Sequence, residues 1–209
     1  MTWSILARDA ETGELGAAVA SRFLAAGALC PRVEGQVGVA CTQALVNPFI
    51  ALDALARLRA GEAPDAALAA LLAADPGAPV RQAHVLGADG RSARHTGEDC
   101  VGWCGDAAGP DVSVAGNMLA GPQVILVTRD AFLASAGLPL AERLMLAMEA
   151  GEAAGGDKRG RQSAAIIAAS ADPYPDLDLR VDDHADPLAE LRRLYGVWHG
   201  YLRHFRRFL

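Results

Sequence analysis

Thr2 carries a hydroxyl group that could act as a nucleophile at the start of the chain. Its small side chain favours removal of Met1, which would leave a free α-amine on the same residue. An α-amine has a pKa of roughly 8, so it could take the hydroxyl proton without a separate histidine. The chemistry expected is attack on an amide carbonyl, although an ordinary first strand residue has the same pattern.

Two asparagines could assist such an attack. Asn47 and Asn117 each lie where a strand gives way to a turn that contains proline or glycine. Their amides could hold a substrate carbonyl or an oxyanion at the edge of a sheet. Asparagine in such places also braces the turn itself, and the sequence leaves both interpretations open.

The segment 155–161 is a charged, glycine-rich loop with the sequence Gly-Gly-Asp-Lys-Arg-Gly-Arg. Arg159 and Arg161 could bind an anionic group, helped by close backbone approach at the glycines. We count Asp157 with them among the expected substrate-binding residues. A solvated hairpin loop is the alternative.

A metal site is not expected, although suitable residue types occur. Asp182, Asp183 and His184 are possible ligands, but their spacing fixes no particular site. Asp186 is explained more simply as the N-cap of a helix that starts at Pro187. The Thr2 chemistry needs only protein groups, and no glycine-rich phosphate-binding motif joins a strand to a helix. We therefore expect neither a metal nor an organic cofactor.

The composition limits the class of protein. The chain has 209 residues, of which 52% are hydrophobic and 21% are charged, so it is expected to fold. The net charge of −6 disfavours a nucleic-acid partner. No apolar run approaches the ~20 residues that span a bilayer, and no secretion signal is visible. We expect a soluble cytoplasmic protein that acts on a small molecule or a peptide.

A set of predicted strands and helices must position these residues. Alternating segments at 2–7 and 15–20, joined by turn residues, predict a β-hairpin. Further strands are expected at 37–42, 82–87, 91–95, 112–115, 163–169 and 177–181. Helices are expected at 49–60, 64–74, 122–135, 138–153 and 187–208. Strands and helices come in blocks, which favours an α+β protein with one domain over residues 1–209.

The helix expected at 187–208 would carry an apolar stripe large enough to need a partner surface. The stripe consists of Leu194, Val197, Trp198, Tyr201 and Phe205. A closed dimer is the commonest way to cover such a stripe, so we expect a homodimer. Packing of the helix onto its own domain is the alternative.

The opening of the chain resembles that of N-terminal-nucleophile (Ntn) hydrolases such as proteasome β subunits. In those enzymes the first strand begins with threonine, a hairpin leads into the second strand, and a lysine precedes the third strand. The resemblance implies catalytic roles for four residues, Thr2, Ser21, Arg22 and Arg32. Ala20 stands where those enzymes have an acid, and Arg32 cannot exchange protons as a lysine does.

A closer resemblance covers nearly the whole chain. Five blocks in order are similar to the DUF1028 family: MTWSILARDAETGELGAAVASRF, ACTQALVNPF, AGNMLAGP, GGDKRGRQSAA and DLRVDDHADPLAELRRL. This uncharacterised family is grouped with the Ntn hydrolases. The resemblance therefore implies a four-layer αββα sandwich of the Ntn-hydrolase type, with helix pairs outside two stacked sheets. It names no substrate, and membership of a fold does not prove catalysis.

Two hypotheses about function follow. The first is an Ntn-type hydrolase that cleaves an amide bond of a small peptide or acylated amine, with Thr2 as the nucleophile. The second is a binding module that has the same sandwich fold but no catalytic activity. The alanine at position 20, where Ntn hydrolases have an acid, favours this hypothesis. Removal or retention of Met1 would separate them.

Overall fold

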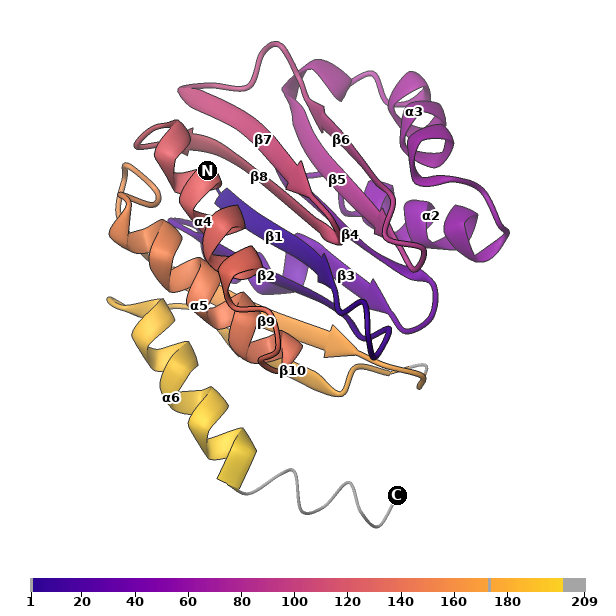
Figure 1. The fold of residues 1–209 in the computed structure, drawn as a ribbon. Helices are drawn as coiled ribbons and strands as arrows, with labels where there is room; N and C mark the ends of the chain where they lie inside the picture. The colour runs from indigo at the N-terminus through magenta and orange to yellow at the C-terminus, as the bar shows by residue number, and fades with distance from the viewer. Residues whose placement is uncertain (1, 173, 201–209) are drawn as a thin grey trace.

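The protein contains two antiparallel β-sheets that pack face to face (Figure 1). The computed structural model describes residues 2–172 and 174–200. Residues 201–208 of the expected C-terminal helix, with Tyr201 and Phe205 of its stripe, lie outside the described residues. The mixed content of strands and helices confirms the α+β class.

The larger sheet has six strands in the order β10-β9-β2-β1-β8-β7. Their bounds in this order are Leu177–Val181, Ser163–Ala169, Leu15–Ser21, Thr2–Arg8, Val112–Leu119 and Trp103–Gly109. The smaller sheet has four strands in the order β3-β4-β5-β6. Their bounds are Pro31–Glu34, Gly38–Ala44, Arg81–Gly87 and Ser92–Thr96. The predicted β1–β2 hairpin is confirmed, and it forms the centre of the larger sheet.

Helices cover the outer face of each sheet (Figure 1). The larger sheet is covered by α4 (Pro122–Ala134), α5 (Leu140–Ala153) and α6 (Pro187–Gly200). The smaller sheet is covered by α2 (Pro48–Arg59) and α3 (Pro64–Ala74). Two short elements, α1 (Ala26–Leu29) and the 3₁₀ turn η1 (Ala78–Val80), lead into β3 and β5. Among the described residues, no helix combines the length and the apolar character needed to cross a membrane.

The alternation along β1 decides which side chains lie between the sheets. Trp3 and Ile5 face the helices and belong to the core beneath α4 and α5. Leu6 faces the other way, into the core between the sheets. Because side chains of a strand alternate between its faces, Thr2 and Ser4 share the inter-sheet face with Leu6. This places the candidate nucleophile at the edge of the inter-sheet space.

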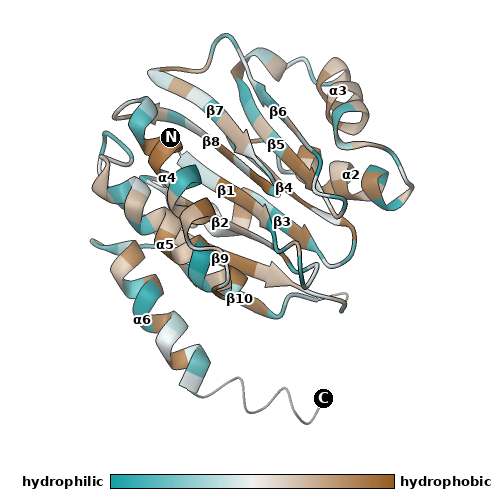
Figure 2. Cartoon of the chain, viewed as in Figure 1, coloured by the Kyte–Doolittle hydropathy of each residue, from teal (hydrophilic) through white to brown (hydrophobic). Residues whose placement is uncertain are grey.

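The helix α6 is amphipathic and packs onto the larger sheet. Leu191 and Tyr195 are buried in the core between the larger sheet and its helices, and Leu194 and Trp198 pack against the same core. Figure 2 shows the polar positions of α6 interleaved with these apolar ones. Val197 remains 51% exposed. Much of the described stripe therefore contacts its own domain, and the homodimer stays a prediction.

Three strands differ clearly from the sequence-based expectation. The strands β3 and β7 were not expected, because β3 begins with proline and β7 (Trp103–Gly109) is rich in alanine and glycine. Both are edge strands, where pairing with one neighbour suffices. The strand β8 also continues past 115 to Leu119. A Cβ on Gly116 would lie 2.5 Å from Leu119 and 2.9 Å from Trp3, so this glycine permits close packing rather than ending the strand.

The contact of α5 with β2 gives a stability test. Leu144 is fully buried, and its Cδ1 lies 2.8 Å from the position that a Cβ on Gly16 would take. We expect Leu144→Ala to lower the free energy of unfolding by about 2–5 kcal/mol, because it removes apolar contacts and leaves a cavity. Leu126→Ala is the control: this leucine of α4 is 43% exposed, so its loss should cost within about 0.5 kcal/mol. Urea denaturation of the two variants checks this, and equal losses would contradict it.

Candidate active site

Four adjacent strands bring hydroxyl and amide side chains together where the strands begin or end, at one end of the larger sheet. Thr2 at the start of β1 pairs with Ser21 at the end of β2 and with Asn117 near the end of β8. Ser21 in turn pairs with Ser163 at the start of β9. The antiparallel register therefore places these four residues side by side, although they are far apart in the sequence.

Thr2 is held by contacts to both its side chain and its backbone. Its Oγ1 lies 3.1 Å from Oγ of Ser21, and either hydroxyl could be the donor. Its carbonyl oxygen accepts hydrogen bonds from Nε2 of Gln43 and Nδ2 of Asn117, each at 3.4 Å. The residue is only 5% exposed. The structure thus brings together the predicted residues Thr2, Ser21 and Asn117.

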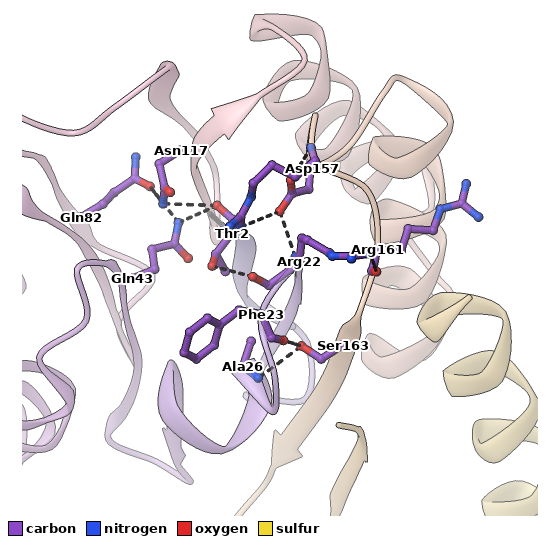
Figure 3. A network of polar contacts seen from close by, with 12 residues as sticks. Thr2, Arg22, Phe23, Ala26, Gln43, Gln82, Asn117, Asp157, Arg161 and Ser163 are labelled. Atoms are coloured by element: carbon purple, nitrogen blue, oxygen red, sulfur yellow. Dashed lines mark hydrogen bonds and ion pairs between the residues drawn. The ribbon is translucent and has the colours of Figure 1, made fainter. Parts of the chain in front are cut away.

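Three side-chain amides, Gln43, Gln82 and Asn117, form an amide cluster between the sheets (Figure 3). Oε1 of Gln82 accepts from Gln43 at 2.9 Å and from Asn117 at 3.0 Å. Nε2 of Gln82 donates to the carbonyl oxygen of Gly116 at 2.9 Å and to Oγ1 of Thr96 at 2.9 Å. The cluster ties β4 and β5 of one sheet to β1 and β8 of the other.

A series of buried hydrogen bonds continues from the amide cluster deeper into the space between the sheets. The hydroxyl of Ser4 donates to Oε1 of Gln43 at 2.8 Å and lies 2.8 Å from Nε2 of His84. Nδ1 of His84 lies 3.0 Å from Oγ of Ser113. Complete burial lowers the pKa of His84 to about 3. The imidazole is therefore neutral at pH 7, and it joins the sheets rather than providing an accessible base.

The predicted loop 155–161 is anchored to the sheet edge by Asp157. Its carboxylate accepts from the backbone N–H of Arg22 at 2.9 Å and of Arg159 at 2.8 Å. The side chain of Arg159 adds a contact at 3.3 Å, and the Asp157 side chain is only 1% exposed. Figure 3 shows Asp157 next to Thr2 and Arg22. Asp157 thus organises the rim of the site.

The other arginines of the rim are engaged in ion pairs or with backbone carbonyls. Arg161 contacts Glu152 and lies 3.2 Å from Asp186. The guanidinium of Arg22 donates to the carbonyl oxygen of Arg161 at 3.1 Å. These contacts connect the loop to α5, to the start of α6 and to the end of β2. The expected role of Arg159 and Arg161 in substrate binding stays a prediction.

Two predicted site residues lie outside the contacts around Thr2. Arg32 donates to the carbonyl oxygens of Pro31 and Ala28, at 2.7 and 3.0 Å. Asn47 caps α2: its Oδ1 accepts from the backbone N–H of Phe49 at 3.2 Å, and its Nδ2 donates to Asp75. These contacts agree with the interpretation of Asn47 as a residue that braces its turn.

Comparison with known proteins identifies the family. A model described as a family of unknown function, DUF1028, matches residues 2–191. The chain belongs to the DUF1028 family. The crystal structure of the protein SPO2555 from Silicibacter pomeroyi is similar over 94% of this chain and 85% of that one, with 32% identity and a TM-score of 0.88.

Two further comparisons add nothing on the activity of this DUF1028 protein. Anbu (ancestral beta-subunit) from Yersinia bercovieri matches over 99% of this chain and 98% of that one, with 11% identity and a TM-score of 0.40. A similarity at that level carries no argument about fold or function. No curated protein matches the chain.

The DUF1028 chain shows no arranged group of ligands for a metal ion within its described residues. Asp183 accepts a hydrogen bond from Gln162, and Nδ1 of His184 accepts from the backbone N–H of Asp186. Oδ1 of Asp186 accepts from the backbone N–H of Ala189, which confirms its predicted role at the start of α6. The hydrogen bonds of this segment thus serve the local fold.

Sequence reasoning missed several buried polar residues of this DUF1028 protein, among them Ser4, Gln43, Gln82, His84 and Ser113. Four of them lie within strands that were expected, whereas Gln43 lies one residue beyond the expected strand 37–42. A glutamine or histidine inside a buried strand needs a hydrogen-bond partner, so Gln82 and His84 carried a usable signal. The sequence could not say which residues would be their partners.

The anchoring of the loop predicts a cost for removing Asp157. Asp157→Ala leaves the N–H groups of Arg22 and Arg159 without their acceptor. We expect the free energy of unfolding to fall by about 1–3 kcal/mol, as for other buried groups that lose a partner. Asp130→Ala is the matched control, because that side chain is 60% exposed. Urea denaturation checks both variants, and an unaffected Asp157→Ala protein would show that the loop does not depend on this carboxylate.

Buried His84 predicts a loss of stability as the pH falls. Burial lowers the pKa of His84 to about 3 from 6.5, so between these values the unfolded chain binds a proton that the folded protein does not. The resulting slope is up to about 1.4 kcal/mol per pH unit. Relative to a His84→Gln variant, the wild type should lose stability from pH 6.5 to pH 4 and show no such trend above pH 7.5. Parallel urea-denaturation results at all pH values would contradict this prediction.

Proposed function

We propose that this DUF1028 protein is an Ntn-type amide hydrolase whose nucleophile is Thr2. The observation that carries the proposal is the position of Thr2: its hydroxyl contacts Ser21 at 3.1 Å, while Gln43 and Asn117 hold its carbonyl. Two stacked sheets with helices outside them support the assignment to the four-layer Ntn sandwich. We also propose, as the sequence suggested, one domain, a homodimer and a cytoplasmic location.

The proposed reaction begins when residue 1 has been removed and the Thr2 amine is free. The amine takes the hydroxyl proton of Thr2, and Oγ1 forms a bond to the carbonyl carbon of the substrate. The tetrahedral intermediate collapses, its C–N bond breaks, and the leaving nitrogen receives the proton from the amine. Water then attacks the Thr2 ester with the amine as base, which releases a carboxylic acid and restores the hydroxyl.

The neighbouring residues have distinct proposed roles. Ser21 can pass a proton between the amine and the hydroxyl of Thr2, because its Oγ is within hydrogen-bond distance of Oγ1. Asp157 lies next to Thr2 and can orient the amine (Figure 3). Arg22 is fixed at the rim by its N–H bond to Asp157 and can steady negative charge. Arg32, whose guanidinium binds the carbonyl oxygens of Pro31 and Ala28, can contribute positive charge.

A binding module without catalysis is the competing function. It is favoured by one observation, that Thr2 is only 5% exposed. A threonine with a purely structural role at the start of β1 would have the same contacts to Ser21 and Asn117. The two functions differ in whether Met1 is removed and in whether Thr2 is needed for hydrolysis.

The first test is N-terminal mass spectrometry of freshly purified native protein, with hydrolysis of acyl anilides as the activity assay. We expect the mass to lack Met1 and the anilides to be cleaved. Thr2→Ala should lower the rate by roughly three orders of magnitude or more, since it removes the nucleophile. Thr2→Ser should keep part of the activity, because it keeps a hydroxyl.

Thr12→Ala is the control for this series. Thr12 lies in the exposed turn of the β1–β2 hairpin and contacts Asp9, so its loss should leave the rate unchanged. Complete retention of Met1 would rule out the Thr2 mechanism. Undiminished hydrolysis by the Thr2→Ala protein would rule it out as well.

A further inference from the structure

A cleft of about 260 Å³ opens beside the Thr2 site. Its walls come from the ends of β4 and β8, from the turn before β5 and from the segment before β7. The lining residues are Ala44, Leu45, Val80, Asp99, Cys100, Val101, Asn117 and Met118. Asn117 both lines the cleft and donates to the Thr2 carbonyl, so the cleft adjoins the proposed nucleophile.

The backbone around the cleft is held in an unfavourable conformation at two places. Ala44 and Met118 have φ values of 69° and 51°, in the left-handed region that residues with a side chain rarely adopt. Such a conformation is strained and persists only where the surrounding structure enforces it. Both residues line the cleft. The fold therefore maintains the cleft at an energetic cost.

The chemical character of the cleft is mostly apolar. Leu45 is 64% exposed and Val101 is 57% exposed, so an apolar wall is open to solvent. The volume is slightly below the roughly 300–1,000 Å³ of pockets for drug-sized ligands. A group the size of one apolar side chain or a short acyl chain fits this space. Asp99 is the charged residue of the lining.

A cationic side chain, that of Lys158, lies near the cleft residue Met118. Lys158 is the single lysine of the sequence. Its Nζ lies 3.3 Å from the position that a Cβ on Gly102 would take, and Cα of Met118 lies 3.0 Å from the same position. Unlike its neighbours Arg159 and Arg161, it makes no ion pair with a described residue. Its charge is available to a ligand.

We propose that the cleft binds an apolar group on the acyl side of the substrate and that Lys158 binds a carboxylate at the far end of that group. The substrate class is then an amide of a short, ω-carboxylated acyl chain. This inference rests on the proposed function for its orientation: the scissile carbonyl lies at Thr2 and the chain runs past Asn117. The carboxylate must lie on the Lys158 side, because Asp99 would repel it elsewhere in the cleft.

A matched set of anilides tests the inference through activity. Acetyl, hexanoyl and adipoyl anilides differ in chain length and in the terminal carboxylate. We expect kcat/KM to rise from acetyl to hexanoyl by roughly tenfold or more, because apolar contacts in the cleft discriminate between chain lengths. It should rise again from hexanoyl to adipoyl through Lys158. Equal values for all three substrates would overturn the inference.

Two variants assign these effects to the residues concerned. Val101→Trp should fill the cleft, lowering kcat/KM for the two long substrates and sparing the acetyl anilide. Val197→Trp is the control, since Val197 is similarly exposed but lies on α6. Lys158→Met should remove the advantage of adipoyl over hexanoyl through KM, and Lys158→Arg should retain it. If Lys158→Met keeps the adipoyl advantage, the role of Lys158 is wrong.

A binding measurement separates this inference from the proposed function. The Thr2→Ala protein lacks the nucleophile but keeps the cleft, so calorimetry should show that it binds N-methyladipamate and that adding Val101→Trp abolishes binding. Binding without hydrolysis by any form of the protein would support the cleft and contradict the hydrolase. Hydrolysis without dependence on the chain, and without binding of N-methyladipamate, would support the hydrolase and overturn the cleft.

Discussion

Hydrogen bonding inside the space between the two sheets is the constraint on which this structure depends. Packed sheets usually bury apolar side chains there, and around Leu6 and Val39 this protein does so. Between β1, β8, β4 and β5, however, the space holds amides, hydroxyls and an imidazole. A buried polar group without a partner costs roughly 1–3 kcal/mol. Gln43, Gln82 and Asn117 avoid that cost by binding one another, which fixes how the sheets lie on each other.

The same constraint positions the candidate nucleophile. Thr2 is the first residue of a central strand, and its carbonyl is held by two members of the amide cluster. Its place therefore follows from the packing of the sheets rather than from a flexible terminus. Asp157 adds a second restraint by attaching the glycine-rich loop to the end of β2. The cleft lies just beyond these contacts, where the strands have ended and Leu45 and Val101 face solvent.

The sequence alone determined most of the local elements and the part of the site that depends on them. Hydrophobic alternation and turn residues located the β1–β2 hairpin, and that pairing sets Thr2 opposite Ser21. The helix α3 and the strands β9 and β10 have the predicted bounds, because proline, glycine and aspartate mark their ends clearly. The five sequence blocks also indicated the DUF1028 family, which the family model confirms.

Only the tertiary structure decided how distant strands face one another. Gln43 and Gln82 are 39 residues apart, and neither segment indicates that their amides meet beneath Thr2. The edge strand β7 forms from weak strand-forming residues because β8 offers it a free edge. The hydrogen bonds of the amide cluster are non-local, so sequence periodicity, which reports only on neighbouring residues, could not specify them.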